Sequence, residues 1–110
     1  MSWRAQGLKP WILQRVTAVY IVVYLLVLTL NLGSVPVSGY EVWQAWMTST
    51  WVSLTTALFI LCLLLHAWVG MRDVAMDYIK PWLLRFILMT PLGLGLVFMA
   101  IWGFRILFAL

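Results

Sequence analysis

The stretch Trp51–Met71, WVSLTTALFILCLLLHAWVGM, decides the fold. It contains no Asp, Glu, Lys or Arg. A helix needs about 20 consecutive, mainly apolar residues to cross the hydrocarbon core of a bilayer. Two further apolar runs of similar length flank it. The sequence therefore predicts an all-α membrane protein with one domain, residues 1–110, and three transmembrane helices over about 12–33, 51–72 and 82–107.

The composition supports this class. Of the 110 residues, 65% are hydrophobic and 9% are charged, whereas a soluble domain is about 45–50% apolar and about 25% charged. A chain of this length cannot bury so much apolar surface by itself, and disorder needs the opposite composition. The net charge of +4 does not form a basic stripe, so we expect lipid and no nucleic acid as a partner.

The basic residues predict the orientation, because Lys and Arg are retained on the cytoplasmic side. The connection 33–50 carries none, and Arg105 alone favours the opposite side. We expect a multi-pass protein of the bacterial inner membrane, with a cytoplasmic N-terminus and a periplasmic C-terminus. All eight tryptophans then fall near a predicted interface, where indole rings concentrate. The six residues that set this orientation are Arg4, Lys9, Arg15, Arg72, Lys80 and Arg85.

Proline and glycine predict where helices start and connect. Pro10 and Pro81 are placed to open the first and third helices, since proline suits a first helical turn. The connection 33–50 begins with turn composition that includes Pro36 and Ser38.

The third span contains Pro91, Gly93 and Gly95. Proline predicts a kink there. The glycines favour close approach of a neighbouring helix, although glycine is also more frequent in membrane helices generally.

His66 is the only histidine, and it lies about five residues, or roughly 7 Å, from the inner end of the second span. A polar group at this depth needs a partner and is a functional hypothesis. One interpretation is an interhelical hydrogen bond to a carbonyl or hydroxyl. Another is that His66 supplies one axial haem ligand while another chain supplies the second. One histidine cannot build a zinc or copper site.

The helix face around His66 carries small side chains one turn before and one turn after it. Cys62, Gly70 and Asp73 lie within about 40° of it on a helical wheel, which leaves room either for a flat macrocycle or for another helix. Arg15 lies at comparable depth, where its guanidinium would pair with haem propionates or reach out to lipid phosphate.

Asp77 and Tyr78 fall on the second connection, residues 72–81. A phenol can donate a hydrogen bond to a quinone carbonyl while a neighbouring carboxylate orients it or relays protons. The alternative is an interfacial tyrosine beside a solvated acid. All three acidic residues lie outside the apolar runs, which disfavours a small multidrug exporter, a class that needs four spans and an intramembrane carboxylate. We expect no catalysis by this chain alone.

The run His66–Pro81, HAWVGMRDVAMDYIKP, resembles the signature of the D-type hydrophobic membrane anchor chains of bacterial succinate dehydrogenase, respiratory complex II. The residue types and spacing of His-Ala-Trp-x-Gly-Met and Asp-Tyr-x-Lys-Pro carry the resemblance. Residues Ile12–Ala18 and Tyr40–Trp43 are also similar to that family.

The resemblance implies a non-catalytic subunit that pairs with a cytochrome b-type anchor and docks a flavoprotein and an iron–sulfur subunit. His66 then matches an axial ligand of a shared b-type haem, and Tyr78 matches the tyrosine that hydrogen-bonds ubiquinone. Asp77 matches the acid beside it, and Arg15 an arginine near the haem propionates. A haemless anchor of a fumarate reductase is the alternative within this class.

Overall fold

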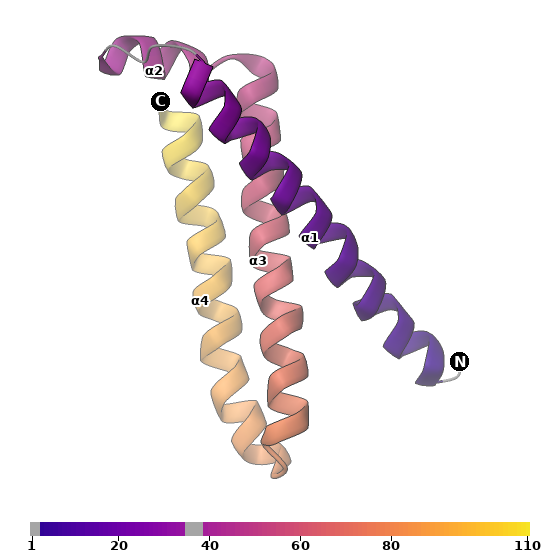
Figure 1. Ribbon diagram of the computed structural model, residues 1–110. Helices are drawn as coiled ribbons and strands as arrows, with labels where there is room; N and C mark the ends of the chain where they lie inside the picture. Colours follow the sequence, from indigo (N-terminus) through magenta and orange to yellow (C-terminus); the bar gives the residue numbers. More distant parts are fainter. Residues whose placement is uncertain (1–2, 35–38) are drawn as a thin grey trace.

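The computed structural model describes the backbone of residues 3–34 and 39–110, and the side chains from Leu8 onward within those ranges. Three described helices are long and apolar enough to cross a membrane, which confirms the predicted number. The N-terminal end of the first helix lies at the same end of the molecule as the link between the last two (Figure 1). The helices are α1 (Trp3–Ser34), α2 (Tyr40–Met47), α3 (Thr50–Tyr78) and α4 (Trp82–Ala109).

Helices α3 and α4 form an antiparallel pair, and α1 is inclined to it (Figure 1). With 29 residues, α3 is about 43 Å long and exceeds the hydrocarbon core of about 30 Å. It ends at Tyr78, and the next residue, Ile79, has extended backbone angles and precedes Lys80-Pro81. Proline disfavours helical angles in the residue before it and suits a helix start, so α4 begins directly after Pro81.

Two predicted boundaries were wrong. The connection predicted over residues 72–81 is helical up to Tyr78. No proline or glycine interrupts this segment, and its charged side chains are compatible with a helix that extends beyond the membrane. Pro10 does not open the first helix, which begins at Trp3 and continues through this proline. A proline removes only one backbone hydrogen bond, and membrane helices tolerate that loss.

Helix α2 lies within the connection predicted as a turn. It follows Gly39, whose φ of 93° suits glycine, which has no Cβ. Glu41 in the first turn interacts favourably with the helix dipole. The Gln44 side chain donates a hydrogen bond to the Leu110 carbonyl at 2.7 Å, so α2 is joined to the end of α4. The turn residues Pro36 and Ser38 lie outside the described residues, as do the side chains of Trp3 and Arg4.

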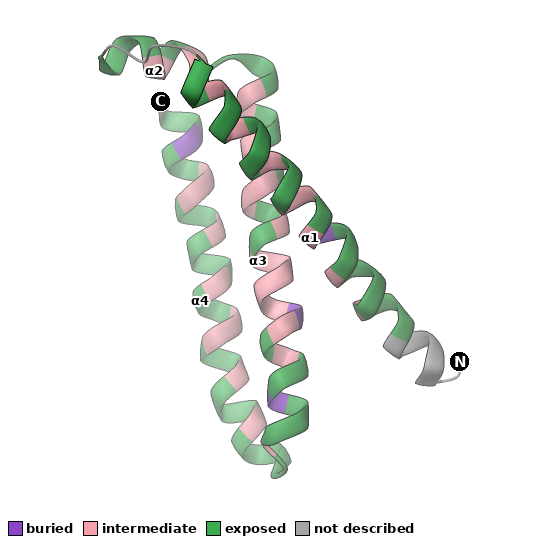
Figure 2. Ribbon diagram, viewed as in Figure 1, coloured by how far each residue is buried: buried purple, intermediate pink, exposed green. Residues whose placement is uncertain are grey.

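The chain has almost no core of its own (Figure 2). Among the described side chains, only Thr17, Val69, Ala75 and Leu107 are buried. The accessible surface is 8308 Å², whereas a compact protein of 12.7 kDa exposes about 6,200 Å². Lipid or other chains must therefore cover most of the apolar surface.

Glycine lets α4 approach α3 at two places. A Cβ built on Gly93 would lie 3.0 Å from the Trp68 ring, and one on Gly103 would lie 3.4 Å from Ile60, while nothing lies within 4 Å of Gly95. The packing expectation is therefore confirmed for Gly93, whereas Gly95 meets no other helix in the part of this chain that the structure describes. Helix α4 continues without a break through Pro91.

The α1–α3 interface is more polar. The Tyr20 hydroxyl donates to the Thr55 carbonyl at 2.7 Å, and the hydroxyls of Tyr24 and Thr56 share a hydrogen bond of 2.7 Å. The Tyr24 ring also stacks on Phe59 with centroids 4.3 Å apart. Hydrogen bonds between helices supply specificity in a membrane, where helix association has no hydrophobic driving force.

We predict that Gly93→Leu weakens the α3–α4 contact, because its side chain would overlap the Trp68 ring. Overpacking of this kind costs about 1–3 kcal/mol. Gly95→Leu is the matched control, since both changes raise helix propensity equally and only one meets a neighbour. Detergent denaturation followed by circular dichroism should show Gly93→Leu as the less stable variant. Equal midpoints for the two variants would contradict this packing.

Candidate functional site

His66 lies on α3 with its ring against α1. Its Nδ1 is 3.1 Å from the Thr17 hydroxyl oxygen, and its Nε2 is 3.4 Å from the Gln14 side-chain nitrogen. Thr17 is 2% exposed, while His66 and Gln14 are half-buried. The interhelical hydrogen bond considered from the sequence is therefore present, and the longer contact leaves Nε2 weakly engaged.

Gln14 and Thr17 were not identified from the sequence as site residues. They lie three positions apart and so share one face of α1. The one available signal was the presence of two polar residues at this spacing where the first apolar run begins. The Gln14 Oε1 atom is buried and has no hydrogen-bond partner among the described residues. A buried carbonyl oxygen without a partner is rare in proteins, which makes this position unusual.

Helix α1 covers part of the small face around His66. A Cβ built on Gly70 would lie 3.4 Å from the Gln14 side chain. At Gly70, the small residue therefore makes room for another helix, which is α1. A planar group approaching His66 Nε2 would have to displace the Gln14 side chain.

Arg15 lies beside this cluster and points elsewhere. Its guanidinium stacks over the Trp11 ring, 5.3 Å from the centroid, an arrangement that attracts the cation to the aromatic face. Arg15 lines a cavity of about 380 Å³ whose other lining residues are Pro10, Trp11, Gln14, Arg72 and Asp73. The two arginines suit carboxylates, because arginine pairs with them through two hydrogen bonds, although Asp73 already brings one carboxylate to this cavity.

Asp77 and Tyr78 lie in the last turn of α3, apart from the His66 cluster. Tyr78 is twelve residues beyond His66 in one helix, or roughly 18 Å along the axis. It is 81% exposed, and Asp77 is exposed as well. The structure therefore does not bring these two residues together with His66, and both project from the end of the helix.

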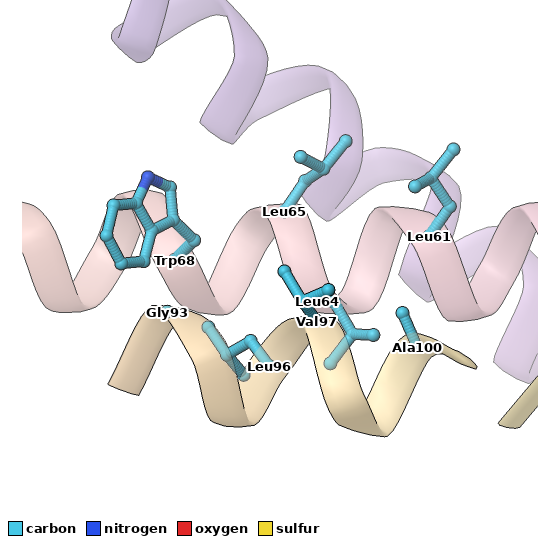
Figure 3. Close-up of a pocket in the computed structure, with 8 residues that line it drawn as sticks. All are labelled: Leu61, Leu64, Leu65, Trp68, Gly93, Leu96, Val97 and Ala100. Atoms are coloured by element: carbon cyan, nitrogen blue, oxygen red, sulfur yellow. The ribbon is translucent and has the colours of Figure 1, made fainter. Parts of the chain in front are cut away.

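A second cavity, of about 360 Å³, lies between α3 and α4. Figure 3 shows the Trp68 ring beside Gly93 and leucines from both helices along the groove. Its lining contains no titratable side chain and consists of Leu61, Leu64, Leu65, Trp68, Gly93, Leu96, Val97 and Ala100. It can hold an apolar chain but offers no ligand to a metal. Trp68, predicted only as an interface residue, is also an interhelical packing residue.

The side chains of this chain that could bind a metal suit a cofactor that takes a single ligand, the His66 imidazole, from it. Within the described residues, no three His, Cys, Asp or Glu side chains come together in a metal-binding group. One imidazole, with Nε2 held only by a long contact, suits one axial position of a haem. The two arginines of the neighbouring cavity suit its carboxylates.

Two comparisons relate the chain to known proteins. A model of the succinate dehydrogenase/fumarate reductase transmembrane subunit family matches residues 1–101. A succinate dehydrogenase hydrophobic membrane anchor subunit of Coxiella burnetii (strain RSA 493 / Nine Mile phase I) is 32% identical over 109 residues, with 93% of this chain and 89% of the relative covered. These matches confirm the resemblance inferred from the sequence. The chain is a multi-pass membrane protein and belongs to the succinate dehydrogenase/fumarate reductase transmembrane subunit family.

Proposed function

We propose that this chain is an anchor subunit of a succinate:ubiquinone oxidoreductase that supplies one axial ligand to a b-type haem and part of a ubiquinone site. The single observation that carries the proposal is the intramembrane imidazole of His66, which α1 holds through Nδ1 while Nε2 has only a 3.4 Å contact. Family membership supplies the enzyme class.

A haem bound here would transfer single electrons, and this chain would provide its ligand and its charge partners. His66 Nε2 offers the lone pair for the iron. Arg15 and Arg72 line one cavity together with Gln14, and they would pair with propionates at the membrane surface. The second axial ligand would come from a cytochrome b-type anchor, because the described residues of this chain contain no second histidine.

Tyr78 and Asp77 would form this chain's part of the ubiquinone site. The exposed phenol can donate a hydrogen bond to a quinone carbonyl, and the adjacent carboxylate can orient it or relay a proton. Because Tyr78 is 81% exposed, another subunit must complete and dehydrate such a site.

The partners follow from the uncovered surface and from the family. The long helices expose most of their apolar side chains, which fits a second helical anchor and lipid. A flavoprotein and an iron–sulfur subunit would oxidise succinate and deliver electrons at the end that carries Tyr78. The alternative, a haemless fumarate reductase anchor, belongs to the same family, and the placement of His66 favours the haem-binding type.

We further propose that the N-terminus is cytoplasmic and the C-terminus periplasmic. Arg72, Lys80 and Arg85 lie around the α3–α4 link, at the end of the molecule where α1 begins (Figure 1). The opposite end carries α2 and the C-terminus, and lysine and arginine concentrate on the cytoplasmic side.

Replacing His66 tests haem ligation. We expect His66→Leu to lose the haem or to convert a bis-histidine low-spin spectrum into a different one, because leucine offers no lone pair. The measurement is the reduced-minus-oxidised spectrum of the purified complex, with its subunits confirmed by gel. Cys62→Ala, one turn away, is the control and should keep the spectrum. An unchanged bis-histidine spectrum in an assembled His66→Leu complex would remove this assignment.

Replacing Tyr78 tests the quinone site. Tyr78→Phe removes only the hydroxyl. The quinone carbonyl gains negative charge during reduction, and loss of a hydrogen bond to it corresponds to a rate of quinone reduction that is lower by about tenfold or more. We expect quinone reduction to slow by that factor while succinate oxidation with a soluble dye is retained. Tyr40→Phe, at the other end of the molecule, is the control. Equal quinone turnover in wild type and Tyr78→Phe would count against this role.

The orientation is tested with fusions to the full chain. A reporter enzyme that is active only in the periplasm should be active when it follows Leu110 and inactive when inserted at the α3–α4 link. The reverse pattern would exclude the proposed topology, and activity at both positions would exclude a single orientation.

A further inference from the structure

The contacts of the Thr17 hydroxyl bear on which nitrogen of His66 carries the hydrogen. Its oxygen lies 2.7 Å from the Leu13 carbonyl, 3.1 Å from the Gln14 carbonyl and 3.1 Å from His66 Nδ1. Both carbonyls can only accept, and a hydroxyl has one hydrogen to donate. The shortest contact, to Leu13, therefore uses that hydrogen.

Other threonines of the chain make the same bond. Thr29, Thr48 and Thr55 each donate to the carbonyl four residues earlier, at 2.7, 2.7 and 2.8 Å. This back-bond is common for threonine in helices. Since the Thr17 hydrogen is directed to Leu13, its oxygen is left as an acceptor for His66. His66 Nδ1 must then be the donor.

The consequence appears on the other side of the ring. A neutral imidazole protonated at Nδ1 has its lone pair at Nε2. The Gln14 amide nitrogen faces that lone pair at 3.4 Å, and a reversed amide would instead bring an oxygen lone pair against it. The contact is long for a hydrogen bond, and the Gln14 Oε1 atom stays buried without a partner among the described residues.

We infer that Thr17 is a positioning residue that holds His66 as its Nδ1–H tautomer, which leaves the lone pair on Nε2, the atom that would act as the ligand once Gln14 moves aside. The hydrogen bond from Nδ1 also raises the basicity of Nε2, as such outer partners of metal-bound histidines do. The part of this inference that concerns iron rests on the proposed function, whereas the tautomer concerns the chain alone.

The tautomer can be measured directly because His66 is the only histidine. The full chain, labelled with ¹⁵N-histidine, is studied by NMR in detergent micelles and alkaline buffer, where imidazole is neutral. The expected spectrum has a protonated Nδ1 and an unprotonated Nε2. A wild-type chain with mainly Nε2–H would overturn the inference.

Variants test whether Thr17 is the residue that sets the tautomer of His66. Thr17→Val is similar in shape but removes the acceptor, and should shift the tautomer ratio toward Nε2–H by about fivefold, the effect of one net hydrogen bond. Thr17→Ser should restore the wild-type ratio. Thr29→Val removes the same kind of back-bond far from His66, and Gln14→Leu removes only the contact to Nε2, so both should keep Nδ1–H. An unchanged ratio in Thr17→Val would overturn the assignment to Thr17.

The purified complex provides the second measurement. Because a less basic Nε2 stabilises ferric iron less, Thr17→Val should raise the haem midpoint potential. An effect of about tenfold on the ferric-to-ferrous ratio equals about 59 mV for one electron. Thr17→Ser and Thr29→Val should match wild type. A midpoint potential unchanged in Thr17→Val would overturn the positioning role.

A failure of the proposed haem ligation and a failure of the role assigned to Thr17 would give different results. If the haem spectrum persists unchanged without His66, the proposed function fails, but the NMR result on the chain still stands. If His66 proves to be the ligand while Thr17→Val changes neither the tautomer nor the potential, the inference fails and the proposed function survives.

Discussion

An imidazole inside an apolar span must find hydrogen-bond partners within the protein, because lipid offers none. In this chain α1 supplies them to His66 through Thr17 and Gln14. This requirement sets the face and the register with which α1 packs on α3. Tyr20 and Tyr24 continue the same seam toward the other end of the helices, where they contact Thr55 and Thr56. Four polar residues of α1, which are Gln14, Thr17, Tyr20 and Tyr24, thus lie on the face turned to α3.

The contrast with the α3–α4 contact is informative. That interface is apolar and depends on shape, with Gly93 against Trp68 and Gly103 against Ile60. One interface of α3 therefore contains the polar contacts of His66, and the other holds the antiparallel pair together. Outside these two interfaces and the contacts of α2, most of the large apolar side chains that the structure describes are exposed (Figure 2). Such a molecule is built to be completed by lipid and by other subunits, as befits a membrane anchor family.

Composition was sufficient to predict the three long helices, because few other structures can accommodate an uncharged run such as Trp51–Met71. It did not predict α2, since the turn residues before it resemble a plain connection and a helix of eight residues leaves little periodic signal. The glycines show a similar limit. Gly93 and Gly95 are two positions apart, so they point to nearly opposite faces of α4, and the pattern alone does not say which one meets α3.

The site was predicted in part. The depth of His66 identified it as a candidate, and its interhelical hydrogen bond was one of the interpretations considered. Its partners were not found, because the register between two helices depends on their packing and not on the periodicity of either one. Arg15 and Tyr78 illustrate the remaining gap: the structure gives their surroundings within one chain, and their roles in haem and quinone binding are proposals that depend on groups from other subunits.

The central claim is that this chain contributes one half of a haem site. The most direct measurement is the haem content and reduced-minus-oxidised spectrum of the native complex, purified in mild detergent through a tag on this chain. We expect one b-type haem for each copy of the chain, with the low-spin spectrum of two histidine ligands. An intact complex that contains the flavoprotein and iron–sulfur subunits but no haem would contradict it.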